Sequence, residues 1–167
     1  MKKGVLFILL FMVWILLTWP FGKDIDYQSI FIGLIVSFFS SLIFGDGFTQ
    51  SPHKFLGVKR YFWSIVYIPV FLYYCLLANL DVAFRVLHPA LPINPGIVKV
   101  KTKLKSKSGI TALANSITLT PGTMSVDVEP ESGYIYVHWI YVRTQNIEKA
   151  TEIIVRRFEK ILKRIFE

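Results

Sequence analysis

Three long uncharged segments are the feature that most limits what this chain can fold into. Residues 4–19, 27–44 and 61–78 contain no Asp, Glu, Lys or Arg and are rich in aliphatic and aromatic residues. An α-helix rises about 1.5 Å per residue, so segments of this length approach the ~30 Å hydrocarbon core of a bilayer. The sequence therefore predicts a membrane protein with most of its apolar mass before residue 96.

The first two segments form the predicted transmembrane hairpin, residues 1–45. The bulky stretch Thr18–Phe21 has no small-residue cleavage site, so we expect the first helix to be retained rather than removed as a signal peptide. Gly45-Asp46-Gly47 is expected to stop the second helix. Small residues at helical spacing allow close approach of another helix, so we expect three of them to make contacts between subunits: Gly33, Ser37 and Ser41.

The third segment has two readings. Its length favours a third span, which would place the lysine-rich tail outside the cell. Lysines flank the hairpin at Lys2-Lys3 and at Lys54 and Lys59, so the positive-inside rule instead favours a cytoplasmic tail. Residues 61–78 would then lie along the membrane interface. The sequence favours the cytoplasmic tail without deciding whether the segment crosses.

Residues 46–95 form a predicted middle region, and residues 96–167 a small α+β domain. Asp81 and Arg85 are four residues apart on one helical face and are expected to pair. Three prolines, Pro89, Pro92 and Pro95, exclude a helix and mark the domain boundary. The fold class is therefore α+β: two firm transmembrane helices, a third spanning or interfacial one, and a C-terminal β-α-β-β-α domain.

Within the tail, residues 97–105 alternate apolar residues with lysines, which predicts a half-buried strand. Ser108 is expected to cap a helix over 109–116. Residues 124–129 and 134–142 predict a hairpin whose second strand is apolar on both faces, so it is central in the sheet or faces a partner. Tyr136 and His138 on that strand are expected to make contacts between subunits.

The last segment, residues 146–166, is a predicted amphipathic helix that covers the sheet. Asn146 is expected to cap it. Two pairs at i,i+4, Glu152 with Arg156 and Glu159 with Lys163, are expected to support its exposed face.

No catalytic or metal-binding pattern is present in the sequence. It has no P-loop or Gly-x-Gly-x-x-Gly, its three histidines are far apart, and Cys75 is its one cysteine. We therefore expect no enzyme activity, cofactor or metal. The formal net charge of +8 suits nucleic acid or an anionic membrane surface, and the apolar segments favour the membrane over nucleic acid.

One polar motif joins the helix to the hairpin. In the motif, residues 114–123, Pro121-Gly122 predicts a tight turn with φ > 0 at the glycine. The turn is flanked by hydroxyl groups that can satisfy backbone groups locally. The motif residues assigned to this structural turn are Thr118, Thr120, Pro121, Gly122 and Thr123.

This motif, with residues 126–128 and Tyr134–His138 after the hairpin, resembles the E subunit of the multisubunit Mrp-type (Mnh-type) Na+/H+ antiporters. The resemblance extends over nearly the whole chain. It implies an accessory subunit in a bacterial or archaeal cell membrane, with other antiporter subunits and lipid as partners. In that family ion translocation is usually placed in the large subunits, so no catalytic residue is carried over.

The resemblance therefore predicts an assembly or stabilising subunit of a Na+/H+ antiporter, without an ion pathway of its own. The alternative is a membrane-anchored binding module whose basic tail docks on anionic lipid or a soluble partner.

Overall fold

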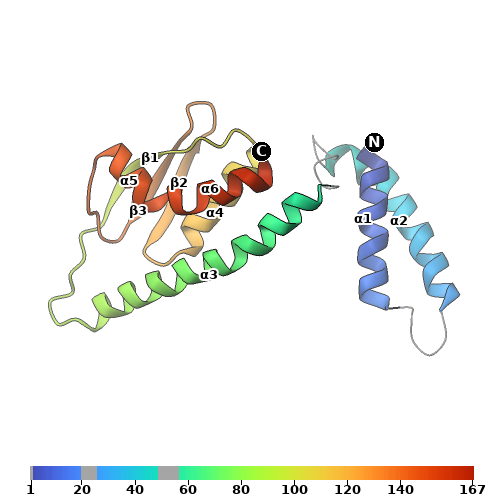
Figure 1. The fold of residues 1–167 in the computed structure, drawn as a ribbon, viewed down its shortest axis with the longest axis horizontal. Coiled ribbons are helices and arrows are strands. Elements are labelled where there is room, and N and C mark those ends of the chain that lie inside the picture. Colours follow the sequence, from blue (N-terminus) through green and yellow to red (C-terminus); the bar gives the residue numbers. More distant parts are fainter. Residues whose placement is uncertain (1, 20–25, 49–56) are drawn as a thin grey trace. The chain divides into compact units, whose positions relative to one another are not determined.

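The computed structural model describes residues 2–19, 26–48 and 57–167. Its contacts form two compact units, residues 1–58 and 59–167 (Figure 1). The predicted polar turn at residues 22–26 lies mostly outside the described residues, and so does Lys54. The predicted boundaries after residues 45 and 95 stay a prediction, because contact units do not test which segments fold alone.

The first unit is a helical hairpin. Helix α1 (Lys2–Thr18) packs against α2 (Tyr27–Phe48). The Trp14 ring lies directly over Gly33, where an added Cβ would clash with it, and the indole N–H donates to the Ser29 carbonyl at 3.0 Å. Helix α2 continues through Gly45-Asp46-Gly47 to Phe48, so the expectation that these residues stop the helix is wrong.

The first helix of the second unit is α3 (Val58–Leu87), a 30-residue helix whose first residue falls in the first unit and which continues through Pro69. Three antiparallel strands follow: β1 (Gly96–Lys101), β2 (Thr123–Glu129) and β3 (Tyr134–Trp139), in the order β1-β3-β2. Of the two alternatives for the strand that is apolar on both faces, the structure shows the central position. A register shift between Ser125 and Asp127 marks a bulge in β2. The mixed α+β class is confirmed.

Helices α4 (Lys107–Leu119), α5 (Ile147–Ile154) and α6 (Arg156–Phe166) complete the unit. The cap of α4 is Ser106, whose hydroxyl accepts from the Gly109 N–H at 3.1 Å, so the prediction of Ser108 is wrong. The Asn146 cap is confirmed by its bond from the Lys149 N–H. Val155 divides the predicted final helix into α5 and α6.

One face of the sheet and the last two helices share the core. Ile135 and Val137 of β3 are fully buried, as are Ile154 and Phe158. The pair Glu152–Arg156 is confirmed at 3.1 Å. Glu159, however, is only 7% exposed and points inward, where it accepts from the Thr102 hydroxyl and the Lys103 N–H, both at 2.6 Å. The expected pairing of Glu159 with Lys163 on the exposed face is therefore wrong.

Helix α3 closes the other side of this core. The ring centroids of Tyr67, Phe71 and Tyr74 lie 6.3, 6.0 and 5.7 Å from that of Phe158 on α6. These distances fall in the range preferred by aromatic pairs. A long apolar helix that hydropathy would count as a span is therefore part of the folded C-terminal unit.

We expect Phe158→Ala to destabilise this unit by about 3–5 kcal/mol, because it leaves a cavity beneath three rings. A core of this size supplies little more than that, so the unit should unfold or melt at a much lower temperature. Val126→Ala, at a half-exposed bulge position, is the control and should change stability by less than about 0.5 kcal/mol. Denaturant titration in detergent, followed by tryptophan fluorescence, measures both. Equal unfolding midpoints for the two variants would contradict the importance of Phe158 for this packing.

Candidate functional site: the motif turn and its seat on helix α3

The predicted motif turn is a type II β-turn between α4 and β2. The Thr123 N–H donates to the Thr120 carbonyl at 3.2 Å, with Pro121 and Gly122 at the central positions. Gly122 has φ +85°, the left-handed value that this turn requires at its third residue. The Pro-Gly pair therefore forms the turn that its sequence predicts.

The hydroxyl groups of the motif bind the end of α4 to the hairpin. Thr120 Oγ1 donates to the Ser116 carbonyl at 2.7 Å, and Thr123 Oγ1 donates to the Ile117 carbonyl at 2.8 Å. Thr118 Oγ1 accepts from the Ser125 N–H at 3.1 Å. The last carbonyls of a helix lack partners within it, so these bonds complete the C-terminal end of α4. They support a structural role for the motif.

The motif also contacts α3. A Cβ added to Gly122 would lie 3.4 Å from Val82 Cγ2 on α3 and 3.0 Å from Ile140 Cγ2. One turn earlier on α4, Ser116 Oγ hydrogen-bonds with Tyr67 Oη. The polar turn is therefore a contact point between the hairpin and the long helix, which sequence reasoning missed. One feature of the sequence could have indicated this contact: aromatic residues recur every three or four positions along α3, as on a helix face that packs against a core.

Arginines of α6 border the same helix. The guanidinium of Arg164 lies 4.1 Å from the ring centroid of Trp63, and that of Arg157 lies 5.3 Å from that of Tyr74. Both distances suit cation–π attraction. Burial lowers the pKa of the Arg157 guanidinium. Within the described residues, its buried Nε has no hydrogen-bond partner.

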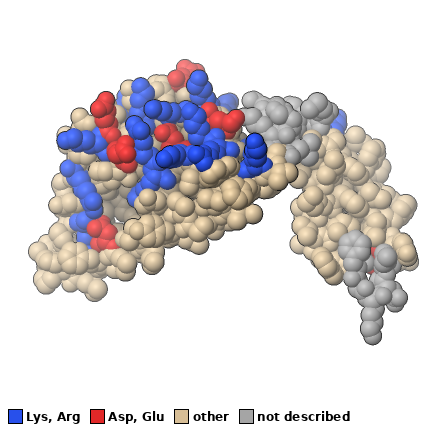
Figure 2. Space-filling view, viewed as in Figure 1, with Lys and Arg blue, Asp and Glu red and all other residues tan. Residues whose placement is uncertain are grey.

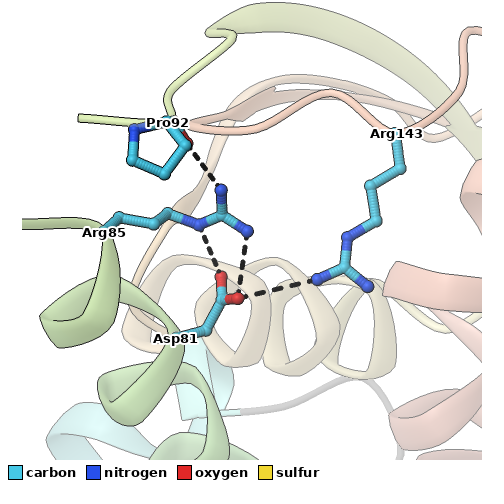
Figure 3. A network of polar contacts seen from close by, with 4 residues as sticks. All are labelled: Asp81, Arg85, Pro92 and Arg143. Carbon is cyan, nitrogen blue, oxygen red and sulfur yellow. Dashed lines mark hydrogen bonds and ion pairs between the residues drawn. The ribbon is translucent and has the colours of Figure 1, made fainter. Parts of the chain in front are cut away.

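A polar network closes the C-terminal end of α3 (Figure 3). Arg85 Nε and Nη2 donate to the two carboxylate oxygens of Asp81 at 2.9 and 3.0 Å, which confirms the predicted pair. Arg85 Nη1 donates to the Pro92 carbonyl at 2.6 Å, and Arg143 lies 3.7 Å from the same carboxylate. The Arg85 side chain is only 9% exposed. The network ties the proline-rich connection and the end of the sheet to α3.

The predicted contacts between subunits lie in two places. On α2, Ser37 and Ser41 are 2% and 3% exposed, and Gly33 lies under Trp14. These small residues thus allow α1 of the same chain to pack closely against α2. Their contact with a different subunit stays a prediction.

Tyr136 and His138 share the other face of the sheet, opposite the buried side chains of β3. Ile97 and Met124 pair with His138 in register and are 61% and 50% exposed. The Tyr136 hydroxyl donates to Glu129 Oε1 at 2.9 Å, and hydrogen bonds from Ser132 and Tyr136 lower the pKa of that carboxyl. This face is partly apolar and open, and its contact with a different subunit stays a prediction.

In the described ranges, no group of three or more His, Cys, Asp or Glu side chains could hold a metal ion. The polar side chains brought together are instead bound to backbone groups or to each other. The arrangement therefore supports packing and anchoring.

We expect Gly122→Val to lower the unfolding free energy by about 1 kcal/mol or more, because a β-branched residue is strained at positive φ and its side chain meets Ile140. Gly122→Asn is the matched variant, because Asn tolerates the left-handed region. Its loss should be smaller. Thermal melting of the purified variants in detergent compares their stability. If both variants lost the same stability, contact of the new side chain with its neighbours, and not backbone strain at positive φ, would be the cause.

We expect Asp81→Asn to lower the unfolding free energy by about 1–2 kcal/mol, since Arg85 would remain buried without its charged partner. Glu152→Gln is the control, because it breaks a pair of the same spacing between side chains that are 67% and 52% exposed. That change should cost less than about 0.5 kcal/mol. Denaturant midpoints measure both, and a control as costly as Asp81→Asn would contradict the anchoring role.

Comparison with known proteins places this arrangement in a family. The family model described as Na+/H+ ion antiporter subunit, MNHE, matches residues 7–165. The E subunit of the Na(+)/H(+) antiporter of Bacillus subtilis is 32% identical over 95% of this chain and 98% of its own. That of Alkalihalophilus pseudofirmus is 42% identical over 65% of this chain and 68% of its own.

A solved structure is similar over nearly the full length. A chain of the membrane-bound sulfane sulfur reductase, an archaeal respiratory membrane complex, superposes with a TM-score of 0.81 and 44% identity, covering 99% of both chains. The match of the family model over almost the whole sequence decides the assignment. This chain belongs to the family of Na+/H+ ion antiporter subunits, as a relative of the antiporter E subunits.

Proposed function

We propose that this chain is an accessory subunit that supports assembly and stability of the antiporter complex and has no ion pathway of its own. The observation that carries the proposal is the composition of the hairpin: residues 4–19 and 27–44 contain no Asp, Glu, Lys, Arg or His. Ion and proton paths across a membrane ordinarily require such side chains at depth. Membership of a transporter family also favours a transport component over an enzyme.

The one acidic residue of α3, Asp81, supports the same conclusion. Asp81 accepts two bonds from Arg85 and lies near Arg143, while Arg85 is also bound to the Pro92 carbonyl. A carboxylate held in a bidentate pair is stabilised in its charged form, which opposes the proton exchange that a relay needs. The cluster is suited to holding the proline-rich connection against the end of α3.

The proposed location is the cell membrane, with the hairpin as two passes and the C-terminal unit on the cytoplasmic side. Lysines precede the hairpin at Lys2-Lys3 and follow it at Lys59, and the positive-inside rule favours the cytoplasm for both ends. The proposed partners are the other membrane subunits and the lipid bilayer. The open face of β3, with Tyr136 and His138, is the proposed contact with these subunits in the C-terminal unit.

A second candidate is a subunit of a respiratory membrane complex. It rests on the similarity to the sulfane sulfur reductase chain, which exceeds in coverage and identity that to the antiporter E subunit of Bacillus subtilis. The two candidates share the accessory role and differ in the complex that contains the chain.

Purification of the tagged chain from native membranes tests complex membership. We expect several larger hydrophobic polypeptides to co-purify, and recovery as a lone polypeptide would contradict both candidates. Na+/H+ antiport by the isolated complex would favour the first candidate, and reduction of sulfane sulfur would favour the second.

Antiport per assembled complex tests the accessory role. We expect Phe158→Ala to lower the amount of complex in the membrane, because it unfolds the C-terminal unit. Asp26→Asn, Asp46→Asn and Asp81→Asn should leave antiport per complex unchanged within about twofold. Everted vesicles, normalised to complex abundance by immunoblot, measure both quantities. Loss of antiport in a fully assembled aspartate variant would identify an ion pathway in this chain.

A further inference from the structure

Helix α3 has two different faces along its whole length. Its inner face carries Arg60, Trp63, Tyr67 and Phe71 toward the core and ends at Arg85. The outer face is apolar, and its members are 49–68% exposed: Tyr61, Ile65, Ile68, Leu72, Leu76, Leu80 and Phe84. We call these seven residues the outer stripe. They recur every three or four residues, so they form one continuous surface.

By length and composition alone α3 could cross a membrane, but its inner face is used along the helix for packing within its own unit. Near its beginning, Arg60 Nε donates to the Ile165 carbonyl, and near its end Arg85 is bound to Pro92. A transmembrane helix needs about 20 residues in contact with lipid or other membrane segments. If α3 spanned, the charged helix α6 beside it would enter the hydrocarbon, at a cost of about 2.5–3.5 kcal/mol for each Lys or Arg.

We propose that α3 lies in the plane of the membrane, with its outer stripe in the boundary between headgroups and acyl chains and the C-terminal unit resting on the surface. The occupant of the stripe is the lipid bilayer. In-plane helices of this kind bury one apolar face by about 5–10 Å and keep the opposite side polar.

The charge distribution fits an anionic lipid surface. Figure 2 shows a nearly charge-free band along α3, bordered by the lysines and arginines of the C-terminal unit. Arg157 and Arg164 of α6 lie over the Tyr74 and Trp63 rings, on the side of α3 opposite the outer stripe. An apolar band with cations on the adjoining surface matches a unit that rests on a bilayer containing anionic lipid.

The composition of the stripe favours lipid over a helix of a different subunit. Helices that pack together in membranes use small residues so that their backbones approach closely. Helix α2 has them at its contact with α1, in Gly33, Ser37 and Ser41. The outer stripe has only bulky side chains, with tyrosine at its beginning, which suits contact with acyl chains and the aromatic interface.

The position of α3 in the chain agrees with this location. Helices α2 and α3 are both long and apolar enough to cross a membrane; α2 ends at Phe48, and α3 begins at Val58. A connection this short keeps the start of α3 within about 35 Å of the point where a spanning α2 leaves the bilayer. A 30-residue helix is also about 45 Å long, so a spanning α3 would extend through both headgroup regions as well as the hydrocarbon core.

Spin-label depth measurement on the full chain tests the proposal. On a Cys75→Ala background, single cysteines replace Ile65, Leu72 or Ala83, which lie on one side of α3 and are separated by up to about 27 Å along its axis. Each variant is labelled in vesicles of phosphatidylcholine mixed with phosphatidylglycerol. Collision rates with oxygen and with a water-soluble nickel chelate give the depth of each label. A label at Glu131, exposed in the β2–β3 turn, is the aqueous control.

We expect similar, shallow depths at all three positions, because an in-plane helix keeps its outer side at one level along its whole length. A Leu72 label about 10 Å deeper than the labels at both ends would show that α3 spans and would overturn the proposal. Labels as accessible to nickel as that at Glu131 would show that the stripe faces water, and labels shielded from both reagents would show that protein covers it. Either result would also overturn the proposal. Unchanged near-ultraviolet circular dichroism verifies that each variant is folded.

Discussion

The packing of Phe158 against Tyr67, Phe71 and Tyr74 is the interaction on which the C-terminal unit depends. Phe158 is fully buried, and each ring centroid of the α3 residues lies about 6 Å from its own. Three strands and three short helices form a small core that supplies only a few kcal/mol. The aromatic contact adds the inner face of a 30-residue helix to that core.

Other contacts along α3 add to this packing. The motif turn reaches Val82 through Gly122, and Asp81 and Arg85 hold the proline-rich connection. Each of these contacts is small. Together with the aromatic packing, they join α3 to the rest of the C-terminal unit over most of its length. In this chain the motif turn is therefore part of how the long helix and the sheet are joined. A structural motif of this kind is consistent with an accessory subunit.

Local features were predictable where the cause is local. The Pro-Gly turn, the Asn146 cap and the pair of Asp81 with Arg85 follow from backbone preferences and spacing within a few residues, and the structure confirms them. Predictions failed where a group distant in the sequence decides which way a side chain points. Glu159 points inward because Thr102 and Lys103 offer it donors, and Ser106 caps α4 although Ser108 is chemically equal.

The sequence by itself determined the apolar hairpin, the α+β class and the family, because length, absence of charge and a compact motif are readable without contacts. It left the role of residues 61–78 open, since hydropathy counts apolar residues and not the surfaces that they face. Only the tertiary structure shows which surface each side of the segment faces within the C-terminal unit. One side of α3 is covered by the aromatic core and the other remains an apolar stripe, so half of a segment that resembles a span is used for packing within its own domain.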